Sequence, residues 1–263
     1  MSSSTSTAVK LERISVDVAG PVVRIVLHHP PLNVIDVAMM GELAQSLEEI
    51  ERNDAVSVIV VSGEGKTFSV GVDVAAHTPD KVREMLAKFH SVIRALVVTK
   101  KVTIAAVHGH CLGGGAELAM VCDMVYTTNS AQWGFPEIKL GCYPPVACTA
   151  LAALVGQKRA AELILTGCTI DGIEAAEIGL ANAAVPESAL NSTIDESIER
   201  LRKLSPAALA IAKKASYAWD SMHFDKGLAR AERMYFDELM KTSDAQEGIR
   251  AFMEKRAPKW SGK

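Results

Sequence analysis

Residues Thr103 to Pro145 contain the stretch that decides the fold, and its first part reads T-I-A-A-V-H-G-H-C-L-G-G-G-A-E-L-A (103–119). A β-type run at 102–107 leads into the glycine cluster at 113–115, and the pattern beyond the glycines is helical. Glycines between a strand and a helix allow a ligand to approach the main chain closely, because no Cβ intervenes. The first amides of a helix have no partner within it and lie at the positive end of its dipole. The stretch therefore predicts a socket for negative charge that develops on an oxygen atom.

Two carboxylates lie near this glycine cluster in the sequence. Glu117 is three residues past Gly114 and so belongs to the first helical turn, and Glu137 follows in the loop-like segment G-F-P-E (134–137). Each could have a purely structural role, since a glutamate in a first turn complements the helix dipole and a loop glutamate is commonly solvated. An anion socket with two carboxylates near it is nevertheless the beginning of a catalytic mechanism.

Glycine-rich turns also bind phosphates and dinucleotides in proteins of different classes. No Gly-Lys-Ser/Thr follows Gly115, which argues against a P-loop, and the G-x-G-x-x-G spacing of a dinucleotide site is absent. Tight packing of a helix on a strand would also produce such a cluster. We favour an oxyanion hole.

Composition bounds the class of protein. The 263 residues suffice for one large domain, or for a domain with a helical extension; 49% of them are hydrophobic and 22% charged. A formal net charge of −3 gives no electrostatic argument for binding nucleic acid or an anionic membrane. No apolar run reaches the roughly 18 residues that span a bilayer.

The cysteines and histidines point to no further chemistry. The five cysteines are odd in number, form no C-x-x-C pair and accompany no secretory pattern, which predicts reduced thiols in a cytoplasmic protein. His108 and His110 lack carboxylates or cysteines at ligand spacing, so no metal site is predicted. Met1–Thr7 is rich in Ser and Thr and is expected to form a frayed tail.

The rest of the chain has the pattern of strands with interleaved helices, followed from Ser188 onward by helices alone. We expect a helix that begins at Thr78-Pro79-Asp80 with Thr78 as its N-cap, and the β-branched run Val56–Val61 is typical of a strand buried on both faces. The other expected elements are a hairpin over 14–27, a loop over 67–73, a strand near 181–185 and helices over 37–52, 147–155, 158–165, 171–178, 189–204, 206–219, 224–241 and 244–254.

Four segments in one order carry a resemblance to a known family: F-S-V-G-V-D (68–73), H-G-H-C-L-G-G-G-A-E-L-A (108–119), C-D (122–123) and W-G-F-P-E-I-K-L-G (133–141). With them the chain resembles the crotonase (enoyl-CoA hydratase/isomerase) superfamily over nearly its whole length. The resemblance implies an α/β fold, a spiral of ββα repeats over 1–187 with a C-terminal helical region over 188–263 used in trimerisation. It also implies homotrimers, often paired into homohexamers.

The resemblance assigns roles to the residues near the socket. Val72 and Gly114 would supply the two backbone N–H groups that hold a thioester oxygen, which agrees with the anion socket predicted from the glycines. Glu117 and Glu137 match the two glutamates with which hydratases of the family hold and activate one water. Isomerases often use one carboxylate, so the retention of both favours a hydro-lyase. Coenzyme A would be part of the substrate, with no separate cofactor.

Substrate contacts follow from the same resemblance. The turn at 33–36, the backbone at 71–74, the residues beside the two glutamates and the C-terminal helix would lie along the acyl-CoA, and Phe252 and Lys255 would reach the CoA of an adjacent subunit. A solvated helix face also explains Lys255. The residues expected to bind substrate are Asn33, Ile35, Gly71, Asp73, Val74, Gly113, Pro136, Tyr143, Pro144, Phe252 and Lys255.

One block departs from ordinary enoyl-CoA hydratases. Cys142–Leu151 replaces a block resembling P-G-x-G-G-T-Q-R-L, and with the segment 74–80 it looks most like the hydratases of cyclohexa-1,5-diene-1-carbonyl-CoA in anaerobic aromatic degradation. The alternatives are a general short-chain enoyl-CoA hydratase or an enoyl-CoA isomerase. A non-catalytic RNA- or protein-binding relative is disfavoured, because both glutamates and the glycine socket are present and a basic patch is not.

Overall fold

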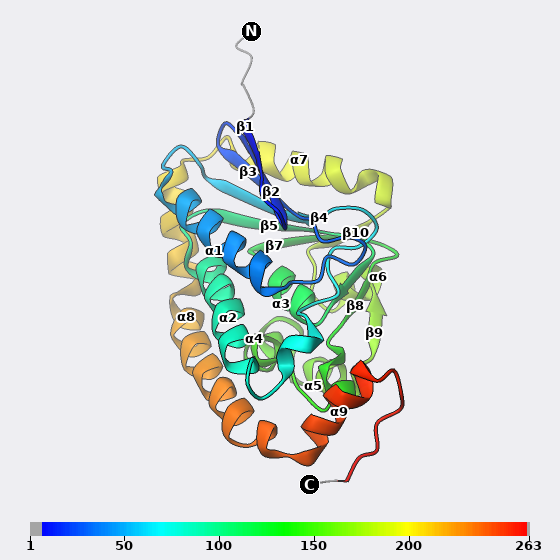
Figure 1. Cartoon of the computed structure of the whole chain (residues 1–263). Coiled ribbons are helices and arrows are strands. Elements are labelled where there is room, and N and C mark those ends of the chain that lie inside the picture. The colour runs from blue at the N-terminus through cyan, green and yellow to red at the C-terminus, as the bar shows by residue number, and fades with distance from the viewer. Residues whose placement is uncertain (1–6, 262–263) are drawn as a thin grey trace.

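The computed structural model describes residues 7–261, with side chains over 11–217 and 224–261 (Figure 1). The strands are β1 (Thr7–Lys10), β2 (Ile14–Ala19), β3 (Val22–Leu27), β4 (Val58–Gly63), β5 (Val102–Val107), β6 (His110–Leu112), β7 (Met124–Thr128), β8 (Gln132–Gly134), β9 (Thr169–Asp171) and β10 (Ala183–Val185). The α-helices are α1 (Val37–Arg52), α2 (Val82–Val98), α3 (Gly114–Met120), α4 (Pro145–Val155), α5 (Gln157–Thr166), α6 (Gly172–Glu177), α7 (Leu190–Leu201), α8 (Pro206–Asp237) and α9 (Ser243–Met253). Short 3₁₀ helices are η1 (Val74–His77), η2 (Pro136–Leu140), η3 (Glu187–Ala189) and η4 (Leu239–Lys241).

A seven-stranded sheet runs in the order β1-β2-β3-β4-β5-β7-β10. The hairpin expected over 14–27 is confirmed, and β1 extends it as a third antiparallel strand. From β3 onward every neighbouring pair is parallel. In a second sheet, β6-β8-β9, strand β6 ends directly before the glycine cluster at 113–115. Of the tail expected over 1–7, residues 1–6 lie outside the described part, and Thr7 already belongs to β1.

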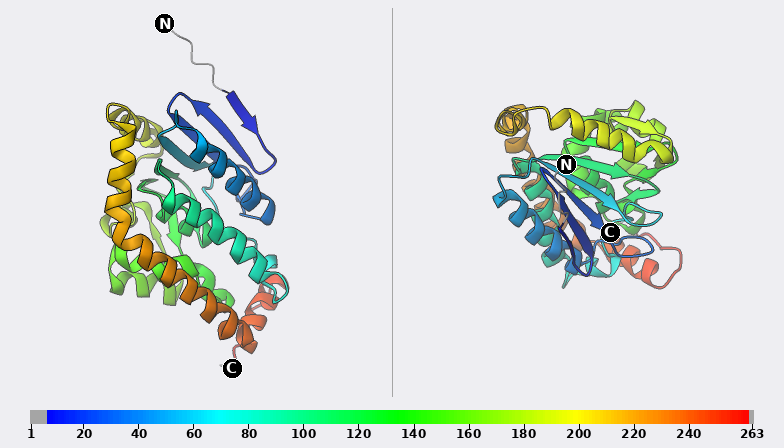
Figure 2. Two further views of the ribbon diagram at one scale, coloured as in Figure 1. Left: turned by 90° about the vertical axis from the view of Figure 1, so that its left-hand side faces the viewer. Right: turned by 90° about the horizontal axis from the view of Figure 1, so that it is seen from above.

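Strands β4 and β5 are buried on both faces, as the β-branched run at 56–61 predicts for β4. Ile59 and Val61 belong to the core cluster that includes α1 and α2, whereas Val58 and Val60 pack with α7. Since side chains alternate along a strand, one continuous apolar run serves both layers. Viewed from above, α7 lies across the sheet on the side opposite α1 (Figure 2).

Helix α7 covers its face of the sheet with a regular apolar stripe. Leu190, Ile194, Ile198 and Leu201 are buried at the spacing of one helix side. Helix α8 then runs along the outside of the molecule past α2 and α4, and α9 ends near η2 (Figure 2). No strand follows residue 188 within the described chain, as expected. None of the helices over 7–261 is both long and apolar enough to cross a membrane.

Two expected helix boundaries are wrong. The helix expected to begin at Thr78-Pro79-Asp80 begins at Val82, because Thr78 O accepts from the Lys81 and Val82 amides in a turn that follows η1. The helices expected over 206–219 and 224–241 are one helix up to Asp237, followed by η4. The four residues between the two expected helices include no Gly or Pro, so nothing interrupts the backbone hydrogen bonds there.

Candidate active site

A cavity of about 660 Å³ lies where the loop before η1, the start of α3, η2 and the C-terminal helices meet. Twelve of the expected site residues line it: Gly71, Val72, Asp73, Val74, Gly113, Gly114, Glu117, Pro136, Glu137, Tyr143, Pro144 and Phe252. Asn33, Ile35 and Lys255 do not. The rest of the wall is largely apolar, so a bound acyl chain would lose water on entering it.

The loop at 67–73 is joined to β6 and to the residues just before it by main-chain hydrogen bonds. The amides of Phe68 and Ser69 donate to the carbonyl oxygens of His108 and His110 at 2.9 and 3.0 Å. In return, the Leu112 amide donates to Ser69 O at 2.9 Å. Gly71 follows with φ of 101°, and a Cβ there would lie 3.0 Å from the Gly114 nitrogen. The loop and the glycine cluster can therefore meet only if residue 71 has no side chain.

Asn33 and Ile35 lie behind this loop and position it. The Asn33 side chain is fully buried and donates from Nδ2 to the carbonyl oxygens of Glu64 and Thr67 at 2.9 and 2.7 Å. Ile35 donates its amide to Gly71 O at 2.9 Å and accepts from the Asp73 amide at 3.4 Å. These two bonds lie on either side of Val72. Asn33 and Ile35 therefore do not line the cavity but hold the backbone of the loop that does.

Two backbone N–H groups meet in the cavity wall. Neither the Val72 nor the Gly114 amide makes a hydrogen bond with any residue over 7–261. A Cβ on Gly114 would lie 3.3 Å from the Val72 nitrogen and 2.7 Å from Val72 Cγ2, so the two residues are in direct contact. Two free donors side by side in a largely apolar cavity have the form of an oxyanion hole.

Glu117 is buried and capped by another helix. Its Oε1 accepts from the Val146 and Ala147 amides, at 2.8 and 3.0 Å, in the first turn of α4. Pro145 opens that helix and has no N–H, so these amides are the first donors available. Burial raises the pKa of Glu117 to about 7, while the two amides act in the opposite direction. Glu117 therefore does more than complement the dipole of α3, the short helix to which it belongs.

Glu137 lies in η2 and faces the same cavity. Its Oε2 is buried without a hydrogen-bond partner among the described residues. A Cβ on Gly113, which has φ of 52°, would lie 2.6 Å from Glu137 Oε1, so the missing side chain makes room for the carboxylate. The pKa of Glu137 is raised well above its usual value by burial first and then by the charge of Glu117. It is therefore not a solvated loop charge.

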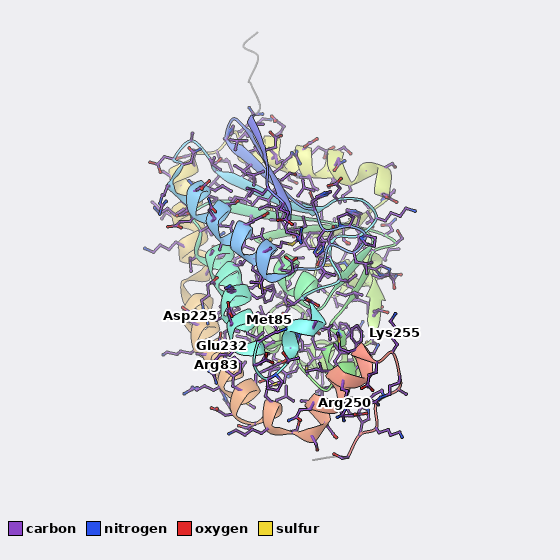
Figure 3. The ribbon with its side chains drawn as sticks, in the orientation of Figure 1. Arg83, Met85, Asp225, Glu232, Arg250 and Lys255 are labelled. Carbon is purple, nitrogen blue, oxygen red and sulfur yellow. The ribbon has the colours of Figure 1, made fainter. Side chains whose placement is uncertain are left out.

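The C-terminal helix positions η2. Gly248 packs against the Leu140 carbonyl, where a Cβ would overlap the oxygen, and a Cβ on Gly141 would lie 2.8 Å from Asp244 O. Phe252 extends from α9 to the cavity and is half exposed. Lys255 lies beyond α9 at the edge of the molecule (Figure 3). A contact of Lys255 with an adjacent subunit stays a prediction.

Several cavity residues were not expected from the sequence. They are Phe89 and Leu86 from α2, Tyr235 from α8, and His77, Lys139 and Arg256. Apolar periodicity marks the first two only as core residues. Tyr235 and Arg256 are separated from the motifs by about half the chain, and no local pattern distinguishes them. Over residues 7–261, no group of three His, Cys, Asp or Glu side chains is arranged to hold a metal ion.

Known proteins match this chain over nearly its whole length. The sequence profile described as Enoyl-CoA hydratase/isomerase matches residues 17–263. Cyclohexa-1,5-dienecarbonyl-CoA hydratase of Thauera aromatica is 35% identical over 246 residues, covering 93% of this chain and 94% of that one. A probable enoyl-CoA hydratase of Bacillus subtilis is 33% identical over 264 residues, with 96% and 100% covered.

Solved structures agree on the fold. The crystal structure of an enoyl-CoA hydratase from Mycobacterium avium subsp. paratuberculosis superposes with a TM-score of 0.86 at 26% identity, covering 96% of this chain and all of that one. The chain belongs to the enoyl-CoA hydratase/isomerase family and has the expected crotonase fold. The expectation of an enzyme of the hydro-lyase class is confirmed by the hydratases among its relatives.

Proposed function

We propose that the protein adds water to the α,β double bond of an enoyl-CoA thioester, or removes it in reverse, with cyclohexa-1,5-diene-1-carbonyl-CoA as its preferred substrate. The observation that carries the proposal is the meeting of the buried Glu117, the buried Oε2 of Glu137 and two free backbone amides in one cavity. The amides account for activation of a thioester, and the carboxylates account for proton transfer to and from water.

The amides of Val72 and Gly114 bind the thioester oxygen. Hydrogen bonds to that oxygen draw electrons from the double bond, so Cβ becomes electrophilic and negative charge gathers on the oxygen as hydroxide adds. The wall around the two donors is largely apolar, which strengthens their interaction with the developing charge. Their positions are fixed by the backbone before the substrate arrives, so little reorganisation is needed.

The environments of the two glutamates assign their roles. Glu117 accepts two backbone N–H bonds that favour its ionised form, so it gives up its proton first and serves as the base for water. Glu137 has no such bonds at Oε2 and feels the charge of Glu117, so it keeps its proton and donates it to Cα. After addition, Glu117 holds the proton from water and Glu137 is ionised; proton exchange with solvent restores the pair.

Two observations support the cyclic substrate: the block Cys142–Leu151, which differs from that of ordinary hydratases, and the name of one relative. Tyr143, Pro144 and Pro145 line the same cavity as Glu137. They belong to the block that, by the family resemblance, replaces a glycine-containing block of ordinary hydratases. A proline pair is rigid and presents a fixed apolar surface, which suits a flat ring better than a flexible chain. The relative from Thauera aromatica is named for the cyclic dienoyl substrate.

Side-by-side assays test the proposal. Crotonyl-CoA and cyclohexa-1,5-diene-1-carbonyl-CoA are compared by absorbance, with the unaltered protein, Glu117→Gln and Glu137→Gln. We expect faster turnover of the cyclic dienoyl thioester and a loss of about 10²–10⁴ in each variant. Preference for crotonyl-CoA would indicate a general short-chain hydratase. Double-bond migration without incorporation of labelled water oxygen would indicate an isomerase and overturn the hydration chemistry.

Assembly, compartment and cofactor use are part of the same proposal. We infer a homotrimer or homohexamer acting in the cytoplasm, with residues 188–263 as the helical trimerisation region and no cofactor other than the CoA of the substrate. Exposed apolar side chains such as Leu165 and Ile211 support a subunit interface, and the free cysteines fit a reducing compartment. Sedimentation equilibrium tests the assembly, because a monomeric mass at micromolar concentration would contradict it. Activity that persists after exhaustive dialysis against a chelator tests independence from a cofactor.

A further inference from the structure

Tyr235 brings a phenol hydroxyl from α8 into the wall of the active-site cavity. The residue is 1% exposed, and its buried hydroxyl oxygen has no hydrogen bond of normal geometry to any described residue. Within the described part of the chain, the one side chain that interacts with the hydroxyl as a hydrogen-bonding neighbour is Cys142, whose thiol is a weak partner. Buried tyrosine hydroxyls usually have a partner. An open donor in a cavity wall therefore indicates a polar group that arrives with a ligand.

The neighbouring Tyr143 shows the usual arrangement. Its hydroxyl donates to Ala231 O on α8 at 2.6 Å, so it has no proton to offer to the cavity. The rings of Tyr143 and Tyr235 pack edge to face, with centroids 5.1 Å apart and planes at 68°. Tyr143 thus holds the Tyr235 ring in place, and only Tyr235 of the two offers a free donor.

The segment of α8 that carries Tyr235 is fixed to α2. Glu232 accepts from His90 Nδ1 at 2.7 Å and from Arg94 Nη2 at 3.1 Å. The Arg83 guanidinium lies 4.1 Å from the centroid of the Phe236 ring. Both contacts join α2 to α8, and Arg83 and Glu232 are labelled there (Figure 3). These contacts lie on both sides of Tyr235 in the chain, so they fix the helix segment that carries its buried ring.

A buried acceptor lines the same cavity. Glu137 Oε2 has no partner among the described residues, and its charge acts on Tyr235. The pKa of Tyr235 is raised well above its usual value, by burial first and then by Cys142 and Glu137, so the phenol keeps its proton and acts as a donor. The Cys142 thiol donates to Leu140 O at 3.7 Å, and its sulfur is a weak acceptor.

We propose that Tyr235 and Glu137 together bind the hydroxyl group of a 3-hydroxyacyl thioester. Tyr235 donates a hydrogen bond to the hydroxyl oxygen, and Glu137 Oε2 accepts one from the hydroxyl hydrogen. A hydroxyl is the simplest group that satisfies both atoms at once, whereas a saturated acyl chain leaves both unsatisfied. Tyr235 keeps its proton throughout and acts as a positioning residue for the oxygen that enters or leaves. This inference rests on the proposed function, since hydration of an enoyl-CoA makes a 3-hydroxyacyl thioester the product and leaves Glu137 ionised beside it.

Binding measurements on a variant with suppressed turnover test the inference. In the Glu117→Gln protein, the dissociation constants of each enantiomer of 3-hydroxybutyryl-CoA and of butyryl-CoA are measured by calorimetry. We expect one enantiomer to bind more tightly than butyryl-CoA, and Tyr235→Phe to reduce that preference by about 3- to 10-fold, the value of one hydrogen bond. Butyryl-CoA itself should bind equally well to both proteins, which a general loss of structure would not allow.

Two further variants keep the result interpretable. Tyr126→Phe removes a hydroxyl that bonds Ser197 Oγ at 2.7 Å outside the cavity, and it should leave the preference unchanged. Glu137→Ala removes the acceptor and should reduce the preference even if Tyr235→Phe fails to fold. A preference unaffected by both cavity substitutions would overturn the inference. Absence of hydration by the unaltered protein would instead overturn the proposed function, while the hydroxyl preference would still be measurable by binding.

Discussion

One side of the active-site cavity is formed by the loop at 67–73 with β6 and the start of α3, and the other by α8 and α9. The first side is held by main-chain hydrogen bonds between segments that lie about 40 residues apart. The second side docks through side chains, namely Glu232 with His90 and Arg94, and through the close contact of Gly248 with Leu140. Backbone bonds fix atoms tightly and depend little on side-chain identity, whereas side-chain docking can be weakened by single substitutions.

The difference assigns separate tasks to the two sides. The first carries the two free amides that we propose as the oxyanion hole, and their positions must be correct before substrate binds. The second contributes residues to the cavity wall, Tyr235 and Phe252 among them, and braces η2. Substitutions on the first side should therefore affect the chemical step, and substitutions on the second should act more on ligand discrimination and stability.

Gly114→Ala, on the first side, should have the largest effect. Its Cβ would lie 2.7 Å from Val72 Cγ2 and 3.2 Å from Phe89 Cζ, so both amide donors would be displaced. We expect kcat/KM for the preferred enoyl-CoA to fall by about 10²–10³. The matched control is Gly41→Ala on the surface of α1, where a Cβ meets nothing within 4 Å. Equal activity in both variants would contradict the assignment of the hole.

The free energy of unfolding should depend on pH because burial raises the pKa of Glu117. Its folded pKa of about 7 exceeds the ordinary value of 4.5, so the folded protein binds a proton that the unfolded chain has released between those pH values. The stabilisation from this proton is complete below pH 4.5 and is lost as pH rises through 7. Relative to Glu117→Gln, the unaltered protein should lose up to about 3 kcal/mol over this window. Urea unfolding of both proteins from pH 4.5 to 8 measures it, and parallel curves would argue against a buried, protonated Glu117.

Gly248→Ala tests the side of the cavity that α8 and α9 form, and its effect should be smaller than that of Gly114→Ala. Its Cβ would overlap the Leu140 carbonyl and push α9 away from η2, which carries Glu137. Because small misplacements of catalytic groups are costly, we expect kcat/KM to fall by about tenfold. Steady-state kinetics with Gly41→Ala as the control measures the change. Unaltered kinetics together with lowered stability would mean that α9 supports the fold without positioning Glu137.

Glu232→Gln should have the smallest effect. The substitution weakens the bonds to His90 and Arg94, which lower the pKa of the Glu232 carboxyl, while it keeps the shape of the side chain. We expect the free energy of unfolding to fall by about 1 kcal/mol, because the site is partly exposed, and kcat to change little. Glu199→Gln, in a surface pair with Arg202, is the control and should change stability less. A large fall in kcat would mean that α8 does more than hold the cavity wall.

Much of the site could be predicted from the sequence because its signals are local. The glycines at 113–115 mark a close backbone approach, and the two glutamates stand beside recognisable motifs. The parallel strand at β4 and the apolar stripes of α1 and α2 follow from periodicity in the same way. The start of α2 could not be predicted correctly, because the signal Thr78-Pro79 fits a turn as well as a helix cap.

The sequence by itself determined the family, most of the strand and helix pattern and the presence of two glutamates beside the glycine motifs, since these depend on residue type and short spacing. Only the tertiary structure decided that Glu117 caps α4, that Glu137 Oε2 is left without a partner among the described residues, and that Tyr235 from a distant helix faces the same cavity. Burial, pKa and an unsatisfied donor are properties of what surrounds a side chain. Those surroundings come from segments far apart in the chain, which no local pattern encodes.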